Sequence, residues 1–335
     1  SQRLTDRHID LPRLREGGVD ALVFALFIPA SLSPEEGWEL TLKLHQITLD
    51  HLVPGMEQVG TEQQVREAAA RGAVGVILGL ENGRPLSVPG ALAHCARIGV
   101  RYVTLTHWAS HEWCDASTDE PRHGGLSEEG VKIVREMNRL GVLPDLSHIS
   151  DDAVRHVLDV SKAPPLASHS SSRALCDHPR NLSDDLVKEI AERDGLVMAN
   201  TYPAFVGQQA SRVEKERMAR LKPAFEEMDA AYLREPGKHW RERERLLKDN
   251  PLPPVPLSVF VDHVIRLVEL GGEEHVGIGT DLDGISEPLE GFEDVSRFPN
   301  LTAALLERGV DKAGVRLILG ENFLRVLRRA EQLAV

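Results

Sequence analysis

Short apolar runs alternate along the chain with longer stretches of helical pattern. The apolar runs are continuous and rich in Val, Ile and Leu, which is typical of strands buried on both faces of a parallel sheet. Strands are therefore predicted at residues 21–28, 74–80, 102–106, 142–146, 165–168, 196–200 and 276–279.

Helix starts between these runs carry capping signals. Ser33 is a predicted N-cap, because Pro34 follows at the first helical position and Glu36 can complete a capping box. Thr61 and Gln64 predict a second capping box. Two more starts, each a serine followed by two acidic residues that favour the helix dipole, are predicted at Ser127 and Ser183.

This alternation predicts either a doubly wound sheet or a closed barrel. The sequence contains no GxGxxG and no P-loop, which argues against a nucleotide-binding doubly wound sheet. We predict an α/β fold, a (β/α)8 TIM barrel of the metal-dependent hydrolase type, in which residues 1–335 form a single barrel domain whose first strand is missing. The charged segment at about 205–256 is interpreted as a solvated helical insertion, and a lid or an oligomer contact is the alternative.

Composition narrows the class of protein. A net charge of −13 argues against binding to nucleic acid or to an anionic membrane surface. The longest apolar run, 21–28, is far shorter than the roughly 20 residues of a membrane-spanning helix. The three cysteines form no CxxC pair and no signal peptide opens the chain, so we expect a cytoplasmic protein.

Residues able to bind a metal stand directly after five of the predicted strands. A barrel closes the carboxyl ends of its strands into one ring, where barrel enzymes keep their active sites. Imidazoles together with carboxylates suit zinc, which activates water for hydrolysis. The pattern therefore predicts a metal-dependent hydrolase whose candidate residues are Glu81, His107, His148, His169 and Asp281.

Other hydrolytic chemistries lack their signatures. There is no GxSxG nucleophile elbow, and His111-Glu112 is not followed by the second histidine of an HExxH helix.

Several motifs taken together resemble the membrane (renal-type) dipeptidase family, peptidase family M19, of the amidohydrolase superfamily. The similarity covers nearly the whole chain, and its most specific stretches are at 102–107, 138–148, 168–171, 180–181 and 279–284. The resemblance implies a zinc-dependent dipeptidase that also accepts a D-residue at the C-terminal position of its substrate.

The resemblance also implies how two zinc ions are held. Glu81 matches the carboxylate that bridges the two ions, and His148 and His169 match the histidines that complete the second zinc site. Asp281 matches a ligand of the first zinc that also carries a proton between water and the leaving amine.

Three residues match positions that contact the substrate. His107 matches a histidine that can polarise the scissile carbonyl, and Asp281 also faces the substrate. Arg180 matches the arginine that binds the free carboxylate of the dipeptide, a role suited to a bidentate guanidinium. The expected partner is thus a small dipeptide, and relatives in the family are often homodimers.

One departure from the family concerns the His-x-Asp pair that ends the family's first strand and binds the first zinc. His8-Ile9-Asp10 matches the sequence of this pair, yet the residues before it are too polar for a buried strand. His8 and Asp10 are therefore interpreted as look-alikes, with the true pair expected upstream of Ser1. We expect the zinc site of Glu81, His148 and His169 to be the better retained. Another amidohydrolase activity (a lactonase or an acyl-amino-acid hydrolase) and a non-catalytic binding barrel are the alternatives.

Overall fold

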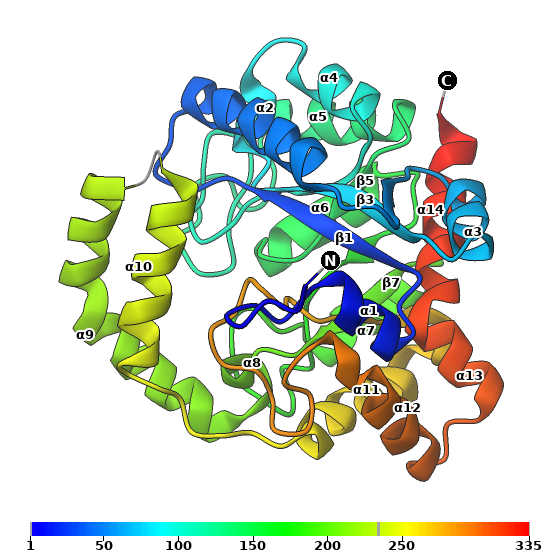
Figure 1. Cartoon of the computed structure of the whole chain (residues 1–335). Coiled ribbons are helices and arrows are strands. Elements are labelled where there is room, and N and C mark those ends of the chain that lie inside the picture. The colour runs from blue at the N-terminus through cyan, green and yellow to red at the C-terminus, as the bar shows by residue number, and fades with distance from the viewer. Residues whose placement is uncertain (1, 233–234, 335) are drawn as a thin grey trace.

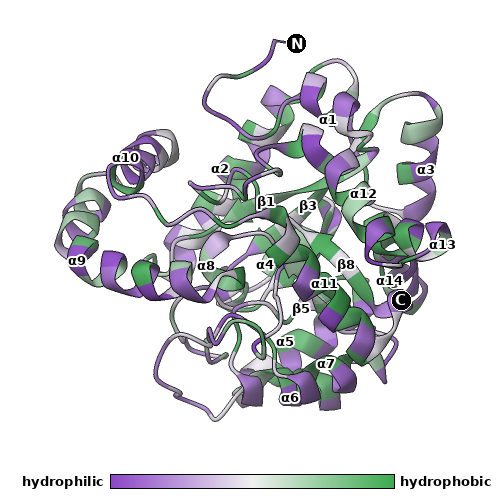
Figure 2. Ribbon diagram, turned by 90° about the horizontal axis from the view of Figure 1, so that it is seen from below, coloured by the Kyte–Doolittle hydropathy of each residue, from purple (hydrophilic) through white to green (hydrophobic). Residues whose placement is uncertain are grey.

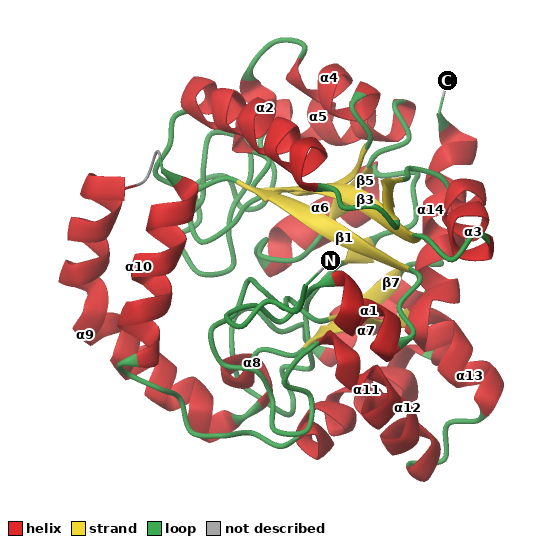
Figure 3. Ribbon diagram, in the orientation of Figure 1, coloured by secondary structure: helices red, strands yellow, loops and turns green. Residues whose placement is uncertain are grey.

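The centre of the protein is a parallel sheet that curls on itself (Figure 3). The computed structural model describes residues 2–232 and 235–334. The strands follow the order β1-β3-β4-β5-β6-β7-β8, and β2 pairs with β3. They are β1 (Ala21–Phe27), β2 (Met56–Gln58), β3 (Val74–Glu81), β4 (Val100–Thr104), β5 (Leu143–Asp145), β6 (Leu166–Ala167), β7 (Leu196–Asn200) and β8 (Val276–Gly279).

Helices surround the sheet, as Figure 1 shows. They are α1 (Leu11–Gly17), α2 (Pro34–His51), α3 (Glu62–Ala70), α4 (Ala91–Arg97), α5 (Glu128–Arg139), α6 (Asp151–Val160), α7 (Asp184–Ala191), α8 (Pro203–Val206), α9 (Gln208–Tyr232), α10 (Pro236–Lys248), α11 (Leu257–Gly271), α12 (Phe298–Glu307), α13 (Lys312–Arg316) and α14 (Asn322–Leu333). No helix within 2–232 or 235–334 combines the length and the apolar character needed to cross a bilayer.

All seven predicted strands are present, in the predicted order. The largest shift is at β4, which begins at Val100 instead of residue 102. The prediction missed β2, because its three residues, Met56-Glu57-Gln58, include no β-branched or aromatic side chain. Its pairing with β3 is what makes this segment a strand: β2 lies beside residues 74–76, and β4 lies beside residues 78–81.

The capping signals place the helix starts correctly, with one correction. Ser33 caps α2 in a complete capping box, in which its hydroxyl accepts from the Glu36 amide at 3.2 Å and its own amide donates to the Glu36 carboxylate at 3.1 Å. In the second predicted capping box, that of Thr61 and Gln64, one of the two expected hydrogen bonds is absent. Thr61 caps α3, but the Gln64 side chain accepts from the amide of Gly60 and not from that of Thr61. Hydroxyls also cap α5 and α7, at Ser127 and Ser183.

The two ends of the curled sheet are β1 and β8, and no ladder joins them within the described part of the chain. β1 is apolar, yet most of its residues are partly or fully exposed, in contrast to the buried β3. Figure 2 shows hydrophobic residues gathered on the strands and on the helix faces that cover them. The fold is thus an open, barrel-like α/β structure, which agrees with the predicted TIM-barrel class.

Helices α9 and α10 form a pair that stands out from the barrel in both Figure 1 and Figure 2. Arg217 of α9 is only 1% exposed and ties this pair to the barrel. Its guanidinium donates to Glu214 of the same helix and to the hydroxyl of Tyr202, which follows β7. It also pairs with Glu287, in the segment after β8. The charged segment around 205–256 therefore has a buried ionic attachment at its base.

Candidate active site

Pairing register aligns the carboxyl ends of four neighbouring strands, β1, β3, β4 and β5. Glu81, the last residue of β3, lies beside Phe27 of β1 on one side and Thr104 of β4 on the other. Thr104 in turn pairs with Asp145, the last residue of β5. The residues that directly follow these strands therefore start from one level, at the edge where barrel enzymes keep their active sites.

Glu81, His148 and His169 form a compact group. Nε2 of His148 lies 3.4 Å and Nε2 of His169 lies 3.5 Å from Oε1 of Glu81, and the ligand atoms of the three side chains all lie within 4.8 Å of one another. Burial, assisted by the charge of Arg180, holds the pKa of both imidazoles well below the usual histidine range. Neutral imidazoles present lone pairs, so this donor set fits a zinc ion.

Hydrogen bonds around His169 fix which of its nitrogens is free. Its Nδ1 lies 2.6 Å from the hydroxyl of Ser168, and that hydroxyl donates to Asp145 at 2.6 Å. Since the hydroxyl has one proton and gives it to Asp145, Nδ1 of His169 is the donor to Ser168. Nε2 therefore keeps its lone pair and faces Glu81, as a metal ligand requires.

Asp145 and Ser168 were not predicted as functional residues. Asp145 is fully buried, and it accepts hydrogen bonds from the side chain of Thr104, from the amide of Ser147 and from both the amide and the hydroxyl of Ser168. A buried aspartate at the end of an apolar strand was the available signal, because such a carboxylate needs several donors. The structure shows that it orients His169.

His107 and Asp281 flank this group. Nε2 of His107 lies 3.8 Å from Oε1 of Glu81, and its pKa is held well below the usual range by burial, followed by the charges of Arg180 and Arg243. Burial raises the pKa of Asp281, against a hydrogen bond from Asn200 at 3.4 Å. Asp281 is not part of the compact group, so the structure brings together three of the four predicted metal ligands.

The environment of Glu81 disfavours the ionised form of its carboxyl group. Its side chain is 16% exposed. Burial, with the charge of Asp281 next in importance, raises the pKa of Glu81 to about 8. Burial and the charge of Asp281 thus outweigh the opposing charge of Arg180, and a cation bound beside Glu81 would favour its ionised form.

Backbone conformation sets the direction of two site residues. His148 has φ of 73° and Asp281 has φ of 58°, in the left-handed region that non-glycine residues rarely adopt. Strain of this kind is of order 1–3 kcal/mol per residue and concentrates at functional sites. Here it turns the chain immediately after β5 and β8.

Arg180 is a buried cation beside the group. It is 2% exposed, and its Nη2 donates to the carbonyl of His169 at 3.2 Å. Its Nη1 lies 3.5 Å from the hydroxyl of Ser170, and its Nε has no hydrogen-bond partner among the described residues. Burial lowers the pKa of Arg180 to about 10, so it stays charged at neutral pH. This guanidinium is available to an anionic ligand.

Two aromatic residues and a second arginine at the site were also missed. Trp108 and Phe205 lie beside His148 and Arg180, respectively. Arg243 of α10 is close enough for its charge to lower the pKa of both His107 and Asp281. No sequence signal marks Arg243, because it is one of many charged residues in α10 and only the fold shows which of them lies near the site.

His8 and Asp10 lie elsewhere. Asp10 caps α1 by accepting from the amide of Arg13, and it pairs with the guanidinium of the same residue. Nδ1 of His8 lies 3.5 Å from Oδ1 of Asp283. Both residues therefore have partners outside the group of Glu81, His148 and His169.

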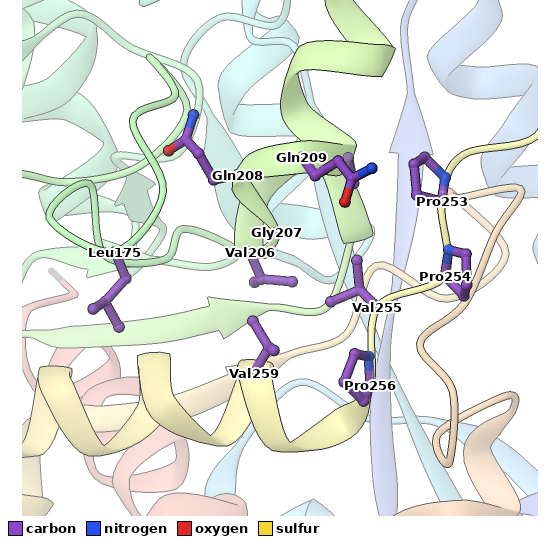
Figure 4. Close-up of a pocket in the computed structure, with 11 residues that line it drawn as sticks. Leu175, Val206, Gly207, Gln208, Gln209, Pro253, Pro254, Val255, Pro256 and Val259 are labelled. Atoms are coloured by element: carbon purple, nitrogen blue, oxygen red, sulfur yellow. The ribbon is translucent and has the colours of Figure 1, made fainter.

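A hollow of about 300 Å³ lies between the start of α9 and the proline-rich segment before α11 (Figure 4). It is lined by Leu175, Val259 and the residues 206–210 and 253–256. None of the predicted site residues lines it, so it is separate from the metal-binding group.

Comparison with known proteins places the chain among dipeptidases. The sequence profile of the membrane dipeptidase family (peptidase family M19) matches residues 1–335. Dipeptidase aclJ of Aspergillus oryzae is 33% identical over 97% of this chain and 71% of that protein. The probable dipeptidase PvdM of Pseudomonas aeruginosa is 25% identical, with a TM-score of 0.83 over 99% of this chain and 91% of that chain. A metallopeptidase from Rhodobacter sphaeroides, solved with a phosphinate mimic of L-Ala-D-Ala, shares the fold at 23% identity, with a TM-score of 0.78 over 98% of this chain and 91% of that chain.

Proposed function

Because the chain belongs to the membrane dipeptidase family, peptidase family M19, we propose that it is a zinc-dependent dipeptidase that accepts dipeptides with a C-terminal D-residue. The observation that carries this proposal is the buried guanidinium of Arg180, whose Nε has no hydrogen-bond partner among the described residues, next to the group of Glu81, His148 and His169. A dipeptide has its free carboxylate one residue away from its only peptide bond, so one site must hold both. The phosphinate ligand of the Rhodobacter sphaeroides relative supports the extension to D-residues.

Glu81, His148 and His169 would hold the better-retained zinc ion. Their neutral imidazoles and the raised pKa of Glu81 support this assignment. A zinc ion supplies Lewis acidity and brings the pKa of a water molecule toward neutrality. Asp281 would contribute to a second, weaker zinc site with Glu81.

The other residues bind the substrate and move protons. Arg180 binds the terminal carboxylate in a site where burial strengthens the ion pair. His107 is neutral, so its ring N–H can donate to the scissile carbonyl and stabilise the charge that develops there. Asp281, whose pKa burial raises, can accept a proton from the attacking water and deliver it to the leaving amine.

A comparison of free and capped dipeptides tests the proposal. The zinc-supplemented protein is assayed with L-Ala-D-Ala, L-Ala-L-Ala, their C-terminal amides, an N-acetyl amino acid and a lactone. We expect hydrolysis of the free dipeptides and at least a hundredfold lower kcat/KM for the amides, because a desolvated guanidinium left without its anion is costly.

Arg180→Met should lower kcat/KM for the free dipeptides to the level of the amides. Arg173→Met is the matched control, since Arg173 lies on the same loop but pairs with Asp151. Equal rates for dipeptides and amides, or hydrolysis of the lactone or N-acetyl amino acid instead, would point to another amidohydrolase activity. A zinc-loaded protein that hydrolyses none of these compounds would be a binding barrel.

We further propose that residues 1–335 act as one barrel domain with an insertion at about 205–256. The proposed partner is a small dipeptide, without nucleic acid or membrane, and the proposed location is the cytoplasm. A homodimer is the proposed assembly, which sedimentation velocity can check.

A further inference from the structure

Trp108 presents an exposed aromatic surface next to the metal-binding group. Its side chain follows His107 directly and is 44% exposed, although most large apolar residues here are buried. Its ring centroid lies 5.3 Å from that of His107 and 5.3 Å from that of His148, in edge-to-face contacts. The exposed surface therefore begins beside the residues proposed to bind the metal and the scissile carbonyl.

The buried ring of Phe205 links Trp108 to the proposed carboxylate-binding residue. Its ring centroid lies 6.5 Å from that of Trp108, and the guanidinium carbon of Arg180 lies 5.4 Å from the Phe205 ring. Phe205 is only 4% exposed and is held by Tyr202 and His178, with centroid distances of 5.0 and 4.6 Å. Trp108 and Phe205, here called the aromatic wall, thus connect the two ends of the site.

The covalent structure of a dipeptide decides which part of it faces this wall. Only the C-terminal residue lies between the scissile carbonyl and the terminal carboxylate. We propose that the aromatic wall is a specificity subsite that binds a large apolar side chain, aromatic or branched aliphatic, of the C-terminal residue of the dipeptide. This inference rests on the proposed function, because it uses the carboxylate bound at Arg180 to orient the substrate.

Physical chemistry favours an apolar occupant. An exposed tryptophan edge gains most when a ligand removes it from water, and aromatic pairs add a geometric preference. Among the described residues, no cation lies over the ring of Trp108, in contrast to Trp240 of α10, which has Arg7 and Arg243 over its ring. An acidic or basic side chain at this position would lose hydration without gaining a counter-charge from the wall.

A series of dipeptides that differ only in the C-terminal residue tests the inference. L-Ala-Xaa substrates with Xaa as Ala, Leu or Phe, in the configuration that the zinc-supplemented protein hydrolyses faster, give the selectivity as a ratio of kcat/KM values. We expect the Phe-to-Ala ratio to be at least about tenfold, the size of effect that an apolar pocket provides. Trp108→Ala should lower this ratio about tenfold, mainly through KM, and Trp108→Phe should retain part of it.

Trp38→Ala is the matched control, because Trp38 lies on α2 with its ring against His94. This variant should leave kcat and KM unchanged. Zinc content and melting temperature of each Trp108 variant show that it is folded and loaded. Dipeptide hydrolysis with a ratio that Trp108→Ala and Trp108→Phe do not change overturns the subsite and leaves the proposed function standing. Absence of hydrolysis for every dipeptide overturns the proposed function and this inference with it.

Discussion

The Nε2 atoms of His148 and His169 lie 3.0 Å apart, and both face the same oxygen of Glu81. The two histidines come from different strand ends, after β5 and β6, and burial keeps both imidazoles neutral. Nδ1 of His148 has no hydrogen-bond partner among the described residues, whereas Nδ1 of His169 is bound to Ser168. The two ligands are therefore held with different strength, a difference that mutations can reveal.

Zinc content should depend on this pair. We expect one tightly bound zinc ion per chain in the wild type, and its loss in His148→Ala and in His169→Ala, because each removes one of three donors. Elemental analysis after gel filtration measures the content, and His51→Ala, an exposed histidine at the end of α2, is the control. Two tightly bound zinc ions per chain would contradict the weaker second site.

Ser168→Ala should weaken zinc binding about ten- to a hundredfold, the usual effect of removing a group that orients a metal ligand. The variant takes away the acceptor of the Nδ1 proton of His169. Competition with a chromophoric chelator gives the zinc affinity. Ser172→Ala is the matched control, since the buried Ser172 hydroxyl has no hydrogen-bond partner among the described residues. An unchanged affinity in Ser168→Ala would show that His169 is oriented by packing alone.

The stability of the metal-free protein should fall with rising pH through Glu81. Its pKa is about 8 in the folded state against 4.5 as the ordinary value, so between these values the folded state keeps a proton that the unfolded state has lost. The free energy of unfolding, relative to Glu81→Gln, should therefore decrease from about pH 4.5 to about pH 8.

Urea unfolding of the chelator-treated proteins at pH 5 to pH 8 measures this difference. Bound zinc should remove this difference in pH dependence, because a bound cation keeps Glu81 ionised. Parallel pH dependence in wild type and Glu81→Gln would contradict the raised pKa.

Arg217→Met should destabilise the fold by about 3–5 kcal/mol without changing zinc affinity, because it leaves the carboxylates of Glu214 and Glu287 unpaired in a buried network. Chemical denaturation gives the free energy of unfolding. Arg220→Met on the same helix is the control, since Arg220 is exposed and its guanidinium donates to the side chain of Asn250. Equal stability of the two variants would mean that α9 needs no ionic attachment to the barrel.

Most of the strands and the five strand-end candidate residues follow from local patterns. Buried parallel strands such as β7 and β8 are continuous apolar runs, and their bounds agree with the prediction because no alternative local structure competes. The candidate residues at the strand ends were found because they follow such runs: Glu81, His107, His148, His169 and Asp281. The strand β2 was missed because its pairing with β3, and not its own composition, makes it a strand.

The sequence by itself determined the order of strands and helices, the residue types at the strand ends and the family. Tertiary structure alone decided which of those residues meet: it gathered Glu81, His148 and His169, set Asp281 slightly apart, and gave His8 and Asp10 other partners. The physical reason is that periodicity and capping act over a few residues. Ligand convergence, in contrast, depends on register between strands and on left-handed turns such as that at His148, which long-range packing enforces.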